Sequence, residues 1–302
     1  MIKIANLQLN RSIKTKHYVF SCIRGYGKRN KSWTKRNRTF KEESIVLASA
    51  KTITENPEAS IVYPKQEKIQ DYCFLLSLAQ NRNIFPVIKI ENGKPIKDYF
   101  YRMGKSYDWP ILDTNETEQF LNAATDSIDN LDEKRQVVVF ETLLWLFEAD
   151  FFTKYRDLKD VWYLLSFEHF CRSIYSLDKN QNPESLKRTE LKDMFMYVNN
   201  DKFQLSGELK SIKGNKNINS FLQDVATVRN WVMHGKVWDK SDVVNKYGSN
   251  GFTFYYRLSS LLKIYLFYFL DFKNFTNKDS MLQGIAYGNA VCPSWDLEKG
   301  II

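Results

Sequence analysis

Three side chains suited to phosphate chemistry occur within one short span of the chain: Arg229, Asn230 and His234. An imidazole has a pKa of about 6.5, so His234 can take a proton from a ribose 2′-hydroxyl or give one to a leaving oxygen near neutral pH. The Arg229 guanidinium is always charged and can stabilise the extra negative charge of a pentacovalent phosphate. Asn230 can hydrogen-bond a phosphate or hold the imidazole in one tautomer. These residue types predict RNA cleavage by internal transesterification, which requires no metal ion.

The apolar spacing around these residues predicts a helix over 217–234 that stops at Gly235. Asn230 and His234, four residues apart, then stack on one face of this helix, and Arg229 projects from its edge. The opposite face is expected to be apolar and to face the core; it contains Val225, Val228, Trp231 and Val232.

The spacing of arginine and histidine is a loose pattern, and Arg11 and His17 match it too. That second match lies in a strand-like, lysine-rich stretch and has no asparagine after the arginine. A histidine at a helix C-terminus is also favoured by the helix dipole, so a capping role for His234 remains an alternative.

The Arg-Asn-x-x-x-His-Gly motif at the end of a late helix resembles the signature of HEPN ribonucleases, particularly the Apea-like HEPN group. The apolar helices expected over 137–152 and 158–175 are similar to the paired long helices of that family, and the resemblance covers roughly residues 120–275. It implies a helical bundle that dimerises so that two motifs face one cleft. It also implies metal-independent endoribonuclease activity, often in antiviral defence or a toxin system.

The family motif falls on Arg229, Asn230 and His234 of this chain, which the resemblance therefore implies are catalytic. Some HEPN enzymes also use an acidic residue on an earlier helix. Glu168 is the candidate for that acidic helper, and the alternative is a helix-surface carboxylate or an ion-pair partner.

The pattern of the whole chain predicts an α+β protein: a mixed, strand-containing N-terminal domain over 1–110, followed by an all-α HEPN-like helical bundle over 111–302. Asn92-Gly93 is a hairpin signal, and Thr114 or Asn115 is expected to cap the first helix after Pro110. In the N-terminal part, strands are expected over 2–4, 7–9, 18–23, 60–63 and 85–90, with a helix over 67–80; later helices are expected over 185–198 and 252–272.

Positive charge is concentrated at the N-terminus. Residues 1–40 contain eleven Lys and Arg and no Asp or Glu, whereas the net charge of the whole chain is +9. This asymmetry favours a polyanionic partner, RNA, at the N-terminal domain; an activating ligand, a foreign protein or a solvated lysine-rich loop are the alternatives. The candidate nucleic-acid-binding residues form what we call the basic cluster, Lys28, Arg29, Lys31, Trp33, Lys35, Arg36 and Arg38, to which Lys236 is added.

Several classes of protein are not expected. The four cysteines are widely spaced and only three histidines occur, so we expect no zinc site and no cofactor. The apolar stretch 258–270 is interrupted by Lys263 and is too short to span a membrane, and no signal peptide is visible, so a cytoplasmic protein is expected. Two functions remain: a ribonuclease, or a non-catalytic HEPN-like module that dimerises and binds nucleic acid or a nucleotide.

Overall fold

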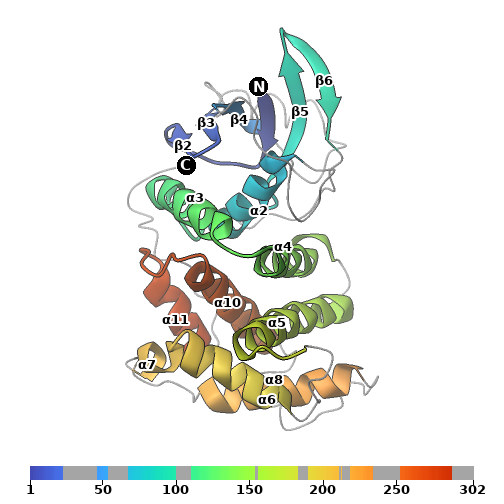
Figure 1. Cartoon of the computed structure of the whole chain (residues 1–302), viewed down its shortest axis with the longest axis vertical. Coiled ribbons are helices and arrows are strands. Elements are labelled where there is room, and N and C mark those ends of the chain that lie inside the picture. Colours follow the sequence, from blue (N-terminus) through green and yellow to red (C-terminus); the bar gives the residue numbers. More distant parts are fainter. Residues whose placement is uncertain are drawn as a thin grey trace. The chain divides into compact units, whose positions relative to one another are not determined.

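The chain has an α+β fold, in which a six-stranded antiparallel sheet is followed by helices (Figure 1). The computed structural model describes residues 1–22, 46–53, 67–99, 110–153, 156–182, 190–210, 212, 218–233 and 252–287. These residues form two compact units, which we call the sheet unit and the helical unit. The division falls after Phe140, and Asp150–Phe152 and Leu270–Phe272 belong to the sheet unit. The boundary between the two units thus lies later in the chain than Pro110, where the sequence pattern becomes helical.

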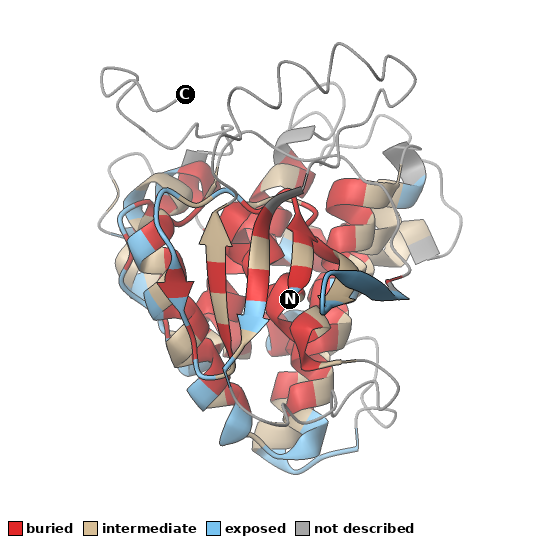
Figure 2. Cartoon of the chain, turned by 90° about the horizontal axis from the view of Figure 1, so that it is seen from above, coloured by how far each residue is buried: buried red, intermediate tan, exposed pale blue. Residues whose placement is uncertain are grey.

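The sheet has the strand order β2-β3-β4-β1-β5-β6, and all its neighbouring strands are antiparallel. Buried and half-buried positions alternate in β1 and at the start of β3 (Figure 2), as expected for strands with one face on a core. The strands are β1 (Ile2–Ala5), β2 (Ile13–Lys14), β3 (Tyr18–Cys22), β4 (Val46–Thr52), β5 (Phe85–Glu91) and β6 (Lys94–Asp98).

Two helices pack with the sheet, α2 (Lys68–Gln80) and α3 (Thr114–Asp129). Tyr72 of α2 meets Tyr18 of β3 edge to face, with ring centroids 5.2 Å apart. The residue that caps α3 is Asp113, whose side chain accepts a hydrogen bond from the backbone N–H of Glu116. The expectation of a cap at Thr114 or Asn115 was therefore wrong by one or two residues, because the carboxylate one position earlier completes a capping box.

Two strands differ from expectation. Residues 7–9 are not a strand, because Asn6 takes a left-handed conformation (φ 60°) and its side chain donates a hydrogen bond to the Asn83 carbonyl, which ends β1. The sequence did not indicate β4, which lies between β1 and β3 and whose central residues Ala48 and Ala50 are small. The strand expected over 60–63 lies outside the described residues.

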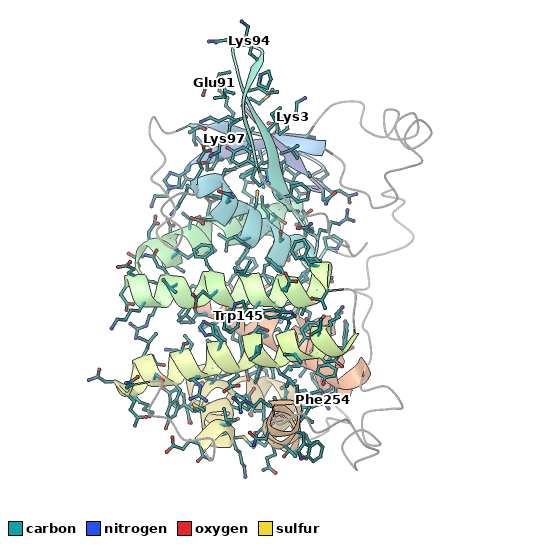
Figure 3. All side chains as sticks on the ribbon, turned by 90° about the vertical axis from the view of Figure 1, so that its right-hand side faces the viewer. Lys3, Glu91, Lys94, Lys97, Trp145 and Phe254 are labelled. Carbon is teal, nitrogen blue, oxygen red and sulfur yellow. The ribbon has the colours of Figure 1, made fainter. Side chains whose placement is uncertain are left out.

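The hairpin expected at Asn92-Gly93 is confirmed. β5 and β6 pair across this turn, and both turn residues have positive φ, 49° and 77°, as a two-residue hairpin turn requires. Lys94 lies near the tip of the hairpin and Lys97 nearer the sheet (Figure 3).

The helical unit is built around α5 (Arg156–Lys179), which packs against α6, α8 and α10. Phe170 of α5 is fully buried, and its ring stacks on those of Phe203 and Tyr265. The other elements of this unit are α6 (Leu191–Met196) with a π-helical turn at Tyr197–Lys202, α7 (Leu205–Lys210), α8 (Ile218–Met233), α10 (Phe252–Phe269) and α11 (Lys278–Tyr287). The residues of α4 (Glu133–Phe147) and of the π-helical turn at Glu148–Phe152 are divided between the two units.

In the described part of the chain, no helix has the length and apolar character needed to cross a membrane. The apolar stretch 258–270 belongs mainly to α10, where Leu258, Leu262 and Leu266 are fully buried in the helical unit. Its apolar character is therefore explained by core packing.

Candidate active site

Helix α8 positions Arg229 and Asn230. The helix packs against α6 and α5, and its Phe221 ring also lies 5.4 Å from that of Phe254 in α10. The buried stripe of α8 consists of Ile218, Phe221, Leu222, Val225 and Val228. Trp231 and Val232, which the sequence placed on the same face, are only half-buried, because they lie in the last turn of the helix.

Arg229 forms a two-point ion pair with Glu168 of α5. The Arg229 Nε donates to Glu168 Oε2 at 2.6 Å, and Nη2 donates to Oε1 at 2.9 Å. The Glu168 side chain is 8% exposed and that of Arg229 is 13% exposed. A charged pair of this geometry in a largely desolvated position holds both side chains in one orientation.

A second arginine shares the same carboxylate. Arg172 lies one turn after Glu168 on α5, and its Nη2 donates to Glu168 Oε1 at 2.8 Å. On the other side of Arg229, Nη1 lies 3.4 Å from the Asn230 side-chain oxygen. Glu168, Arg172, Arg229 and Asn230 thus form one connected polar group between α5 and α8, which we call the α5–α8 cluster.

The ion pair leaves Arg229 able to bind a further anion. A guanidinium has five N–H groups in a planar fork, and the pair with Glu168 uses only the edge formed by Nε and Nη2. The edge formed by Nη1 and Nη2 faces away from that contact, on the side where Asn230 lies. The geometry therefore allows Arg229 to be oriented by a carboxylate and to hold a phosphate oxygen at the same time.

The structure describes some of the expected site residues and not others. It brings Arg229, Asn230 and Glu168 together, with Glu168 as an ion-pair partner of the motif arginine. His234 follows α8 directly and lies outside the described residues, as do Lys236 and every member of the basic cluster, Lys28, Arg29, Lys31, Trp33, Lys35, Arg36 and Arg38.

Arg172 belongs to the cluster, but the sequence reasoning did not single it out as a site residue. The available signal was its spacing, because a residue four positions after Glu168 lies on the same helix face. Arg11 and His17, which match the loose arginine–histidine spacing, each have other partners. Arg11 pairs with Glu118 and donates a hydrogen bond to the Asn115 side chain, and the His17 ring lies edge-on to that of Tyr72. Both residues belong to the sheet unit.

His169, next to Glu168 in sequence, has different surroundings. Its ring lies 4.6 Å from that of Trp145 (labelled in Figure 3), and its Nε2 is 3.2 Å from a carboxylate oxygen of Glu141. Burial lowers the pKa of His169, and the negative charges of Glu141 and Glu168 oppose that effect. The residue is a half-buried packing histidine on the α4 side of α5.

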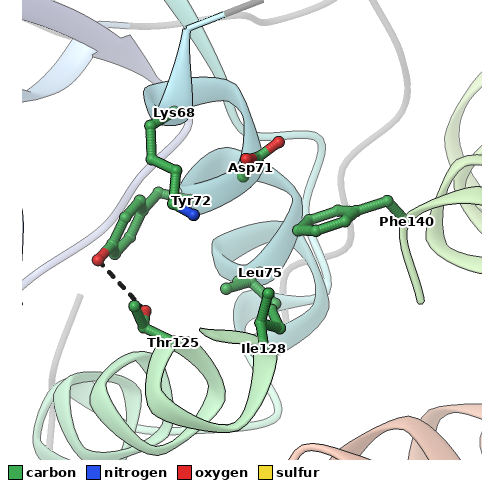
Figure 4. A pocket seen from close by; sticks show the side chains of 7 residues that line it. All are labelled: Lys68, Asp71, Tyr72, Leu75, Thr125, Ile128 and Phe140. Carbon is green, nitrogen blue, oxygen red and sulfur yellow. Dashed lines mark hydrogen bonds between the residues drawn. The ribbon is translucent and has the colours of Figure 1, made fainter. Parts of the chain in front are cut away.

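A small pocket of the sheet unit lies between α2 and α3 (Figure 4). Tyr72 and Thr125 are joined there by a 3.2 Å hydrogen bond, and Lys68 and Asp71 are themselves largely buried. The space admits a water-sized guest, so it does not suit a nucleotide. The lining residues are Lys68, Asp71, Tyr72, Leu75, Thr125, Ile128 and Phe140.

Comparison of the whole chain with protein-family models, with curated proteins and with solved structures found no match in any of the three. The interpretation of the α5–α8 cluster therefore depends on its own geometry and chemistry.

Proposed function

We propose that this chain is a metal-independent endoribonuclease of the HEPN type, which cleaves RNA by attack of a ribose 2′-oxygen on the neighbouring phosphate. The observation that carries the proposal is the two-point pairing of Glu168 with Arg229, directly beside Asn230 on α8. This pairing unites the motif arginine with the acidic residue for which the sequence suggested a helper role.

In the proposed reaction a histidine accepts the proton of the 2′-hydroxyl while the 2′-oxygen forms a bond to phosphorus. The bond from phosphorus to the 5′-oxygen then breaks, and a second histidine gives its proton to that leaving oxygen. The products are a 2′,3′-cyclic phosphate and a 5′-hydroxyl. His234 supplies the acid and the base, one from each chain of a homodimer formed through the helical domain.

Arg229 acts on the phosphate in this mechanism. Negative charge increases on the non-bridging oxygens as the pentacovalent state forms, and a guanidinium held in advance stabilises that charge without having to reorient. Glu168 is a positioning residue because it fixes the Arg229 fork. Asn230 either contacts the phosphate or orients the imidazole.

The N-terminal part of the chain is proposed to bind the partner molecule. The basic cluster over residues 28–38 binds RNA phosphates, or else an activating ligand or a foreign protein. A ribonuclease with such a sensing region suits a cytoplasmic antiviral or toxin system.

One observation favours a second candidate, a non-catalytic HEPN-like module that dimerises and binds nucleic acid or a nucleotide. Arg229 is already paired and mostly buried, as an arginine that only joins two helices would be. The two functions differ in whether RNA is cut.

The deciding experiment compares the wild-type chain with His234→Ala on a labelled RNA in the presence of EDTA. The expected result is cleavage by the wild type only, with 2′,3′-cyclic phosphate and 5′-hydroxyl ends. His17→Ala is the matched control, because His17 belongs to the looser motif match, and it should cut like the wild type. Products with a 5′-phosphate, or full activity of His234→Ala, would refute the proposal.

A further inference from the structure

The two faces of the sheet differ in what covers them. Helix α2 packs on one face, where its Tyr72 ring meets that of Tyr18. Side chains alternate between the faces along a strand, so Lys3, Val19 and Lys51 lie on the opposite face. In the part of the sheet unit that the structure describes, no helix lies on that second face, which we call the open face (Figure 2).

Three lysines cross the open face in a line. Lys14 of β2 and Lys51 of β4 both lie opposite Val19 of β3, so they are two strand spacings, or about 10 Å, apart. Lys3 of β1 lies opposite Ser49, two positions before Lys51, which makes Lys3 and Lys51 diagonal neighbours about 7 Å apart. Lys14 and Lys51 are exposed, and Lys3 is half-buried on the side of the sheet away from α2 (Figure 3). We call Lys14, Lys51 and Lys3 the lysine strip.

The charges of the lysine strip lack partners among the described residues. The strands β1, β2, β3 and β4 contain no Asp or Glu. Elsewhere in the sheet unit lysines do have carboxylate partners: Lys16 and Lys68 pair with Asp129, and Lys97 pairs with Glu67. None of the three strip lysines forms an ion pair with a residue that the structure describes.

The carboxylates at the two ends of the strip do not neutralise it. Glu118 accepts a hydrogen bond from the backbone N–H of Lys14, but its charge is paired with that of Arg11. At the other end, Asp98 lies on β6, two strands beyond Lys3. The middle of the open face therefore carries positive charge that a polyanion can complement.

We propose that the open face binds a single-stranded segment of RNA, whose phosphates follow the lysine strip across the strands. The inference goes beyond the catalytic residues and rests on the proposed function for the choice of RNA among polyanions. A single row of charges fits the backbone of one strand, whereas a duplex presents two backbones. The short side chains of Val19 and Ser49 lie between the lysines, so the ammonium groups project farthest and meet the phosphates first.

The test measures binding of the full-length chain to a labelled single-stranded 2′-O-methyl RNA oligonucleotide, which lacks the attacking hydroxyl, over a range of salt concentrations. The strip variant, with Lys3→Gln, Lys14→Gln and Lys51→Gln, should bind about tenfold more weakly. The slope of log affinity against log salt should become shallower by about 2, because each phosphate contact to a single strand contributes about 0.7.

A charge-matched control removes three exposed lysines from the helical unit, with Lys192→Gln, Lys210→Gln and Lys273→Gln. It has the same net charge as the strip variant and should bind like the wild type. Equal weakening by the two variants would show a general charge effect and overturn the inference. Equal affinity of the wild type for a duplex of the same sequence would overturn the choice of a single strand.

A second measurement uses the unchanged chain, so it does not depend on how the variants fold. Lysines are acetylated with and without the oligonucleotide and read by mass spectrometry. Lys3, Lys14 and Lys51 should react more slowly when RNA is bound, and Lys192 should react at the same rate. Unchanged reactivity of the strip would overturn the inference. So would a strip variant that loses binding only to phosphatidylserine vesicles, because the strip would then bind a membrane surface.

Failure of this inference and failure of the ribonuclease proposal give different results. A chain whose lysine strip is protected by the oligonucleotide but that never cuts natural RNA has this surface and is not a ribonuclease. A chain that cuts RNA, with the KM of the strip variant unchanged, is a ribonuclease without this surface. A wild-type chain that does not bind the oligonucleotide at all has no such surface.

Discussion

Glu168 and Arg229 lie 61 residues apart in the sequence, and their side chains form a two-point ion pair that joins α5 to α8. The pair stands next to Asn230, whose side-chain oxygen lies 3.4 Å from Arg229 Nη1.

Glu168→Gln should separate the rate of cleavage from RNA binding. The neutral amide no longer fixes Arg229, and a misplaced catalytic group lowers the rate at saturating RNA on the order of 100-fold. RNA affinity should not fall, because the change removes a negative charge close to the phosphate. Loss of a charge-assisted partner should also lower the free energy of unfolding by about 2 kcal/mol, measured with urea.

Asp193→Asn is the control for this change, because Asp193 is an exposed carboxylate on α6 of the same unit. It should leave rate, affinity and stability as in the wild type. Equal saturated rates for Glu168→Gln and the wild type would show that Glu168 does not position Arg229 for catalysis.

The basic cluster and Arg229 should affect different steps. Replacing Lys28, Arg29, Lys31, Lys35, Arg36 and Arg38 with Gln should weaken RNA binding and flatten its salt dependence, because each lost phosphate contact releases fewer counterions. Arg229→Ala should instead lower the saturated single-turnover rate by roughly 100-fold or more, with a smaller change in affinity. If the cluster variant binds RNA as tightly as the wild type, its positive charge serves a different partner.

A shared active site in a homodimer predicts that an inactive chain also inactivates its wild-type partner. In a mixture of wild-type and His234→Ala chains, the cleavage rate should fall more steeply than the wild-type fraction, because a mixed dimer has only one of the two histidines that act as acid and base. The measurement is the cleavage rate against mixing ratio, with light scattering to give the molecular mass. A monomer that remains fully active at micromolar concentration would contradict the shared site.

Stability should fall as the pH drops below about 6.5, partly because of His169. Burial lowers the pKa of His169 in the folded chain, so the unfolded chain binds its proton first and is favoured as pH decreases. The nearby carboxylates Glu141 and Glu168 reduce the effect without reversing its sign. His169→Gln should make the free energy of unfolding less dependent on pH in this range; an unchanged dependence would assign the effect to other groups.

Two buried thiols should report the unfolding of the two units separately. Cys73 lies in α2 of the sheet unit and Cys171 in α5 of the helical unit, and burial raises the pKa of both. Because the thiolate is the reactive form, neither should be alkylated in the folded protein. In a chain with Cys22 and Cys292 replaced by Ser, labelling against urea concentration with mass spectrometry gives one curve per thiol. Rapid labelling without urea would contradict the packing of that unit.

The sequence alone determined the features that depend on short-range patterns. The spacing of Val225 and Val228 predicted α8 and the placement of Arg229 and Asn230 on it, because a helix repeats about every 3.6 residues. The Asn92-Gly93 turn after the apolar run 85–90 predicted the β5–β6 hairpin, because few residues accept positive φ. The α+β order of the chain followed from the same local periodicities.

Only the tertiary structure decided the relationships between distant segments. No local pattern shows that Glu168 meets Arg229, since this contact arises where α5 packs on α8. The contact of Arg172 with the same carboxylate is different, because the two residues lie four positions apart on α5. In the same way β4, which contains Ala48 and Ala50, becomes an inner strand because β1 and β3 pair with it on both sides. Burial and pairing of this kind depend on packing across the whole unit, whereas helix and turn signals are contained within a few neighbouring residues.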